Sequence, residues 1–186
     1  MFQKLKKDYD IYEDTRQLIN GRANFILHKA KQSIFALHRG EIKKAENLLK
    51  EVEKDLNILN KHLSKIPPLK YNGLYKAALE EYTEAKLFWQ VLKFGKIKEI
   101  SKVQVNFDDY LGGICDLTGE LVRKMVLLAT ENKFEEVFRL KTIIADIING
   151  LIKIDLTGYL RHKFDEAKRN LEKAEQIVYE LKMMQK

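Results

Sequence analysis

Apolar residues along much of this chain recur at alternating spacings of three and four, which is the period of an amphipathic helix. Long stripes of this kind run over residues 19–37, 45–63 and 160–181. Pro67 and Pro68 follow the second stripe and end its helix, because proline lacks a backbone N–H and clashes with the preceding turn. We therefore expect three long helices here, the first of them over about 8–39.

The middle of the chain has the same helical period. The expected helices lie at about 73–94, 108–130 and 132–150. The expected breaks lie at 95–106, 131–132 and 155–158. Strand-like alternation is nearly absent, and its best candidate is Ile100–Val105. The prediction is an all-α protein, an elongated antiparallel bundle of six or seven helices. Since no linker is long enough to separate two units, we expect a single domain over residues 1–186.

Composition narrows the class of protein. With 45% hydrophobic residues, nine Gly and two Pro in 186 residues, the chain is neither disordered nor collagen-like. Its single cysteine, Cys115, excludes an internal disulfide and suits the cytoplasm, where we expect the protein. The basic start is followed by acids rather than by an apolar run, so we expect neither a signal peptide nor a membrane span. The net charge of +7 fits a polyanionic partner, but acids and bases are interleaved, and a solvated helical surface explains the charge equally well.

An acid interrupts the apolar stripe of the expected helix at 73–94. The stripe reads Leu74, Ala78, Glu81, Ala85, Phe88 and Leu92. Burying an unpaired carboxylate is expensive, so Glu81 is expected to be paired or to bind a metal. Glu84 lies about 60° round the same helix and can reach the same ion. The alternative is a salt bridge from Glu81 to a lysine of a neighbouring helix, with Glu84 exposed.

The next expected helix carries Asp116, Glu120 and Arg123 on one side, with the latter two within about 40° of Asp116. Gly112 and Gly113 fall on that side one turn earlier, where the missing side chains would let a backbone or a ligand approach. The alternative is a solvated face on which Glu120 pairs with Lys124 and the glycines are only tolerated.

Together the two helices offer four carboxylates, and oxygen ligands of this kind suit Mg²⁺ or Mn²⁺. A cation held there could activate water against a phosphodiester, and Arg123 could hold a phosphate oxygen. The hypothesis is metal-assisted phosphodiester hydrolysis, provided that the two helix faces meet. Other chemistry has less support, because the histidines lack metal-ligand spacing and no nucleotide-binding loop or nucleophile elbow occurs. We expect Cys115, Phe88, Trp89 and Phe94 to belong to the core.

Several motifs resemble one known family. Residues 109–123, Asp-Tyr-Leu-Gly-Gly-Ile-Cys-Asp-Leu-Thr-Gly-Glu-Leu-Val-Arg, resemble the signature of the translin family. The intact Asp-Leu-Thr-Gly-Glu-Leu core is closer to the translin-associated factor X branch than to translin itself. Residues 79–85 resemble the Glu-Tyr-x-Glu-Ala motif of that branch, and residues 33–39 and 178–181 match the family in the same order.

The resemblance implies a helical protomer that assembles into a closed octameric shell and binds single-stranded or short duplex nucleic acid inside. RNA or single-stranded DNA is the expected partner. The factor X branch supplies a Mg²⁺-dependent endoribonuclease centre, and its acids correspond to Glu81, Glu84 and Asp116, with Glu120 as a fourth metal ligand. Lys31, Arg39 and Arg123 are the expected nucleic-acid contacts. The chain lacks a basic N-terminal extension, which suggests a minimal, homo-oligomeric form, although a translin-type partner subunit is also compatible. The competing hypotheses are a non-catalytic nucleic-acid-binding shell and a purely structural oligomer.

Overall fold

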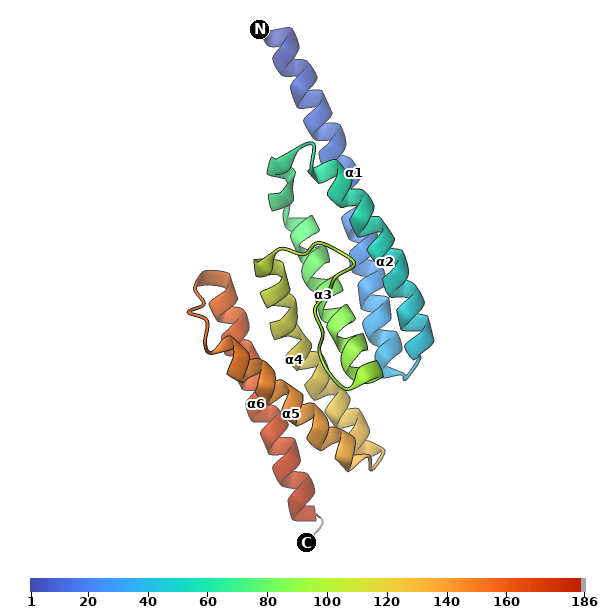
Figure 1. Ribbon diagram of the computed structural model, residues 1–186, viewed down its shortest axis with the longest axis vertical. Coiled ribbons are helices and arrows are strands. Elements are labelled where there is room, and N and C mark those ends of the chain that lie inside the picture. Colours follow the sequence, from blue (N-terminus) through green and yellow to red (C-terminus); the bar gives the residue numbers. More distant parts are fainter. Residues whose placement is uncertain (185–186) are drawn as a thin grey trace.

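The apolar stripes become the buried faces of long helices in the computed structural model, which describes residues 1–184 (Figure 1). Its helices are α1 (Phe2–His38), α2 (Ile42–Leu63), the short 3₁₀ helix η1 (Pro67–Tyr71), α3 (Gly73–Phe94), α4 (Phe107–Thr130), α5 (Phe134–Leu151) and α6 (Gly158–Met184). The predicted all-α class is confirmed. The buried apolar residues form one continuous core.

Single residues determine where several helices start or end. The Asn72 side chain accepts a hydrogen bond from the backbone N–H of Tyr75 at 3.1 Å and so caps the start of α3. Gly95 ends α3 in a left-handed conformation, with φ of 74°, which costs glycine no steric strain. A second such residue, Gly40 with φ of 77°, makes the tight turn between α1 and α2.

The helices pack in a simple spatial order. α1 lies against α2 and α3, α3 lies against α4, and α4 lies against both α5 and α6 (Figure 1). The N-terminal part of α1 and the C-terminal part of α6 extend from opposite ends of the molecule, which makes it elongated. The two helices with the candidate acids, α3 and α4, are therefore neighbours in the middle of the bundle.

Two glycines let α3 and α4 approach closely. A Cβ atom added at Gly113 would lie 2.6 Å from the Thr83 Cβ and 2.7 Å from the Glu80 carbonyl oxygen. At Gly112 it would lie 2.8 Å from the Glu80 Cδ. Of the two roles expected for these glycines, the structure shows the approach of another backbone. Alanine at Gly113 would push the two acidic helices apart because it would meet the α3 backbone, whereas alanine at Gly112 would displace only the end of the Glu80 side chain.

Ile100–Val105, the best candidate for strand-like alternation, forms no strand, and residues 1–184 contain no strand at all, in agreement with the all-α prediction. Ile100 and Val103 are buried because this irregular segment packs on the helices, so its alternation reflects one-sided burial rather than sheet pairing. α1 begins at Phe2 rather than near residue 8, since its N-terminal turns are helical without burying an apolar face. No helix within 1–184 is long and apolar enough to cross a membrane.

Candidate metal and phosphate site

Glu84 of α3 is the most unusual side chain at the α3–α4 contact. The residue is 9% exposed, and its carboxylate has no hydrogen-bond or ion-pair partner among residues 1–184. Burial, with a smaller effect from the negative charges of Glu81, Asp116 and Glu120, raises its pKa to about 9. The alternative in which Glu84 is merely exposed is therefore wrong.

Glu81 lies nearer the surface than Glu84, although the stripe predicted the reverse. Its side chain is 19% exposed, and its Oε2 atom lies 3.9 Å from the Nζ atom of Lys31 on α1. Burial raises the pKa of Glu81, and Lys31 partly opposes that shift. The alternative, a salt bridge from Glu81 to a lysine of a neighbouring helix, is correct in part. Lys31 lies near the longest distance at which two such groups form an ion pair.

These acids open onto a pocket of about 330 Å³ between α1, α3 and α4. Lys31, Ile34, Phe35, Glu81, Glu84, Glu120 and Arg123 line it. Lys31 and Arg123 are half-exposed at its rim, whereas Glu84 is the most buried of its charged residues. The structure thus brings together five of the seven candidate residues on one concavity.

Glu120 is held by groups from α1 and from its own helix. Its Oε2 atom contacts the Nε2 atom of His38 and lies 3.8 Å from the Nη1 atom of Arg123. Lys124 instead donates a hydrogen bond to the backbone carbonyl of His38 at 3.0 Å, so the alternative in which Glu120 pairs with Lys124 is wrong. Sequence reasoning missed His38, because 82 residues separate it from Glu120.

Asp116 is drawn away from the pocket by α6. Lys163 donates a hydrogen bond to its Oδ2 atom at 2.5 Å, and the same ammonium lies 3.7 Å from Glu80. Tyr159 donates a hydrogen bond to Glu80 at 2.8 Å, which completes this small network. Burial raises the pKa of Asp116, and the hydrogen bond from Lys163 partly opposes that shift. Lys163 is a second residue that helical periodicity could not point to.

The carboxylate oxygens of this site are of the type that binds a hard cation, but they do not surround a single position. In the described part of the chain, no three His, Cys, Asp or Glu side chains converge closely enough to hold a metal. Glu81, Glu84 and Glu120 nevertheless share one pocket, and Glu84 is buried without a partner. Carboxylate oxygens in this setting suit Mg²⁺ or Mn²⁺.

The third basic candidate, Arg39, lies in an adjoining pocket rather than in the acidic one. That pocket has a volume of about 340 Å³ and is lined by Gln32, Phe35, Arg39, Lys44 and Leu48.

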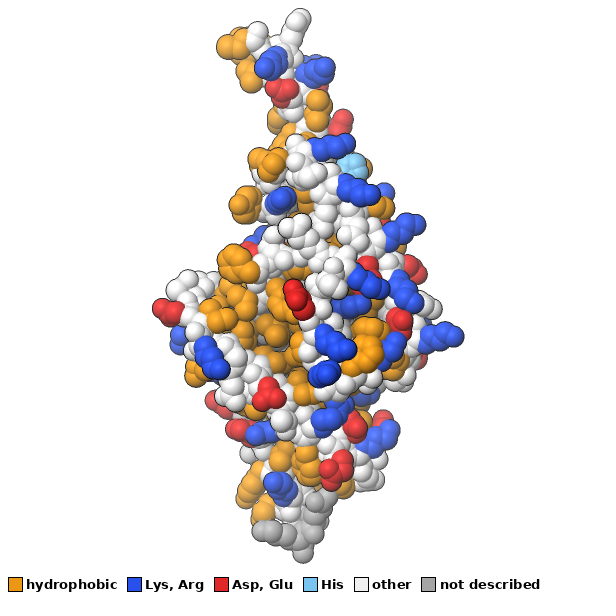
Figure 2. All heavy atoms as spheres, in the orientation of Figure 1, with side chains coloured by type: hydrophobic (Ala, Val, Ile, Leu, Met, Phe, Trp, Pro, Cys, Tyr) orange, Lys and Arg blue, Asp and Glu red, His pale blue; other side chains and the backbone are white. Residues whose placement is uncertain are grey.

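Figure 2 shows Lys and Arg side chains gathered on the right of one face, over α2, and hydrophobic side chains gathered left of its centre.

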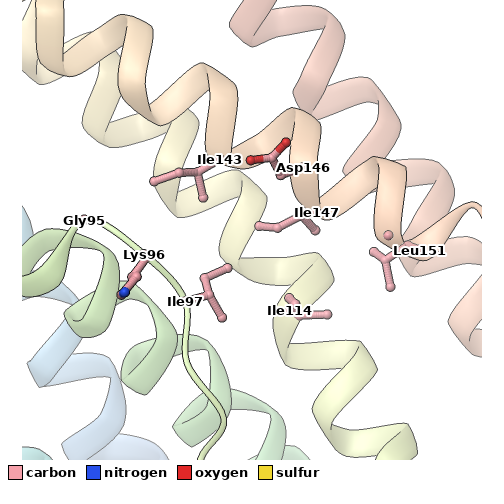
Figure 3. Close-up of a pocket in the computed structure, with 9 residues that line it drawn as sticks. Gly95, Lys96, Ile97, Ile114, Ile143, Asp146, Ile147 and Leu151 are labelled. Carbon is pink, nitrogen blue, oxygen red and sulfur yellow. The ribbon is translucent and has the colours of Figure 1, made fainter.

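A larger groove of about 480 Å³ lies between α4, α5 and the segment that follows α3. Isoleucine side chains from all three segments face it (Figure 3). Lys96 and Asp146 are the charged residues that line it, so its chemistry is that of a packing surface rather than of a reaction site.

The expected core residues are confirmed with one exception. Cys115, Phe88 and Trp89 are buried. Phe94 is 46% exposed, because it lies at the end of α3 and only packs edge-on against Trp89 at 5.3 Å between ring centroids.

Known proteins resemble this chain along most of its length. The model of the Translin family matches residues 14–185. The Translin-associated protein X homolog of Schizosaccharomyces pombe (strain 972 / ATCC 24843) is 24% identical, over 90% of this chain and 80% of that protein. Translin of Gallus gallus is 31% identical over a shorter region, 41% of this chain and 34% of that protein. The longer match agrees with the expected factor X branch.

Solved structures share the fold. The crystal structure of AfC3PO has a TM-score of 0.90 at 23% identity and covers 98% of this chain and 97% of that chain. The crystal structure of apo-NeC3PO has a TM-score of 0.87 at 24% identity, over 96% and 95% of the two chains. The structure of an AfC3PO–duplex RNA complex has a TM-score of 0.77 at 22% identity, over 98% and 97%. With a family model that matches nearly the whole chain and a fold shared along the full bundle, this protein belongs to the translin family.

Proposed function

We propose that this protein is a divalent-metal-dependent endoribonuclease that hydrolyses single-stranded or short structured RNA. The observation that carries the proposal is Glu84, a buried residue whose carboxylate has no partner among the described residues and opens onto a pocket that it shares with two other acids beneath a basic rim. Membership of the translin family supports the proposal, as does the structural likeness to a protein whose complex with duplex RNA has been solved.

The acidic residues would bind the metal, and the basic residues would bind the RNA phosphate. Glu81, Glu84 and Glu120 would hold Mg²⁺ or Mn²⁺, and Asp116 is the fourth carboxylate available once Lys163 releases it. Such a cation, when bound, lowers the pKa of a coordinated water and offsets charge on the reacting phosphate. Lys31 and Arg123 would bind phosphate oxygens at the rim and orient the phosphodiester above the acids. Glu84 holds its own proton at neutral pH, because its pKa is about 9.

A second candidate function is non-catalytic binding of RNA or single-stranded DNA. The pairing of Asp116 with Lys163 favours it, since this acid is already satisfied without a metal. The basic rim would then bind phosphates, and the acids would be structural.

Removal of divalent metal separates these functions. We expect a labelled single-stranded RNA to be cut in Mg²⁺ or Mn²⁺, to stay intact but bound in excess EDTA, and to be cut again when metal is restored. The measurement is product formation on a denaturing gel beside a filter-binding titration at the same salt concentration. Cutting that persists in EDTA contradicts the metal assignment, and saturated binding without cutting in either metal supports the second function.

We also propose that the protein forms a homo-oligomer, for which the family resemblance suggests an octamer; a translin-type partner subunit is the alternative. Phe2, Leu5 and Tyr9 form an exposed apolar stripe on the part of α1 that extends from the bundle (Figure 1). An apolar stripe exposed on such an extension is the kind of surface that a partner covers. The apolar groove in Figure 3 is a surface of matching character. The cytoplasmic location stays a prediction.

Charge placed in that stripe should reduce the assembly. We expect the double variant Leu5→Lys/Tyr9→Lys to shift the solution mass toward the 21.9 kDa of one chain, because lysine in an apolar contact cannot be desolvated cheaply. Ile11→Lys is the matched control, since Ile11 is exposed on the opposite side of the same segment and should keep the wild-type mass. Light scattering at fixed concentration measures both, and a wild-type mass of one chain would refute the oligomer.

A further inference from the structure

Phe35 separates the acidic pocket from the pocket beside it. It lines both, and it is 49% exposed although the residues on either side of it, Ile34 and Ala36, are buried. The guanidinium carbon of Arg123 stands 5.2 Å from the centroid of its ring, on the side of the acidic pocket. The ring therefore presents an aromatic surface to each pocket and contributes little to the core.

The neighbouring pocket has the composition of a nucleotide subsite. Leu48 adds an apolar side chain to its lining, and Gln32 adds an amide that can donate and accept hydrogen bonds. Arg39 and Lys44 also line this pocket. The Glu41 carboxylate forms an ion pair with each of them, at 2.6 Å from the Nε atom of Arg39 and 3.1 Å from the Nζ atom of Lys44. An aromatic face, an amide and two cations in one pocket match the π-surface, the polar edge and the phosphate of a nucleotide.

We propose that this pocket binds an unpaired nucleobase, stacked on Phe35, next to the phosphate held in the acidic pocket. The inference rests on the proposed function and narrows its substrate to RNA with an unstacked nucleotide beside the scissile bond. A base inside a duplex is already stacked on both faces and cannot offer one to Phe35. Aromatic stacking of single-stranded bases tolerates every sequence, because each base has a π-face. The site therefore selects strandedness rather than sequence.

A matched pair of phenylalanines on α1 provides the test. Phe25 is 43% exposed and carries the ammonium of Lys29 at 5.3 Å from its ring, so it resembles Phe35 in exposure and in its cation, but it lines neither of the two pockets. Phe35→Leu should weaken binding of a single-stranded RNA about tenfold. Phe25→Leu should change it less than twofold, and Phe35→Tyr, which keeps the ring, should bind as the wild type does.

The experiment uses a single-stranded RNA that contains 2-aminopurine, in EDTA, so that binding is measured without cleavage. Anisotropy gives the affinity, and 2-aminopurine emission reports stacking. We expect emission to be quenched by the wild type, Phe35→Tyr and Phe25→Leu, and to remain high with Phe35→Leu at saturation. Equal affinity and equal quenching for Phe35→Leu and Phe25→Leu would overturn the subsite and leave the proposed function standing. A wild type that binds no RNA would overturn both.

Discussion

Glu84→Gln is expected to lower metal-dependent RNA cleavage at least about 100-fold, because a cation that supplies several kcal/mol of transition-state stabilisation loses an anionic ligand. Glutamine has the same shape, and Glu84 is already neutral near pH 7, with a pKa of about 9, so the fold and RNA binding should not change. Single-turnover cleavage and a calorimetric Mn²⁺ titration are the measurements.

A carboxylate outside the site serves as the control for this substitution. Glu51 lies on α2, half-exposed beside Lys29, and Glu51→Gln should cleave RNA as the wild type does. If Glu84→Gln cuts RNA within threefold of the wild-type rate and still binds Mn²⁺ as the wild type does, Glu84 is not a metal ligand. An unchanged rate combined with lost Mn²⁺ binding would show that the bound metal does not serve cleavage.

The stability of the protein is expected to depend on pH through the same side chain. The pKa of Glu84 is about 9 in the folded state, against 4.5 for an ordinary glutamate, so the folded state holds one more proton than the unfolded state between these values. Stability from this group is therefore fully present at low pH and is lost as pH rises toward 9. Between pH 6 and 8 the loss amounts to about 2–3 kcal/mol in the free energy of unfolding.

Glu84→Gln isolates that contribution, since all other groups titrate in both proteins. The free energy of unfolding of the variant should gain about 2–3 kcal/mol relative to the wild type from pH 6 to pH 8. Urea denaturation in EDTA, at one protein concentration, measures it. A difference that stays constant with pH would show that Glu84 is ionised in the folded protein.

The acids of this site avoid mutual repulsion in four different ways. Glu84 keeps its proton, Asp116 pairs with Lys163, Glu120 contacts His38, and Glu81 lies at the rim near Lys31. Four ionised carboxylates this close together would be costly without a cation. The arrangement therefore fits a site in which each acid has its own accommodation in the absence of metal.

Much of the fold follows from the sequence, because helical periodicity is a local property. Each stripe with spacings of three and four is the buried face of a helix. Asn72, Gly95, Pro67 and Pro68 lie at or near helix ends, and each affects only the few residues next to it in the chain. The prediction for Phe94 failed where tertiary contacts decide the outcome, since Phe94 is exposed because α3 ends beside the surface.

The sequence by itself determined which helix faces carry the acids, and that Gly112 and Gly113 allow something to approach α4. Only the tertiary structure decided that α3 makes that approach, that Glu84 lies deeper than Glu81, and that Phe35 stands between two pockets. Lys163 and His38, the partners of Asp116 and Glu120, are 47 and 82 residues away in the chain. A helical pattern orients a side chain relative to its own axis, whereas burial and charge pairing depend on which other helices pack around it.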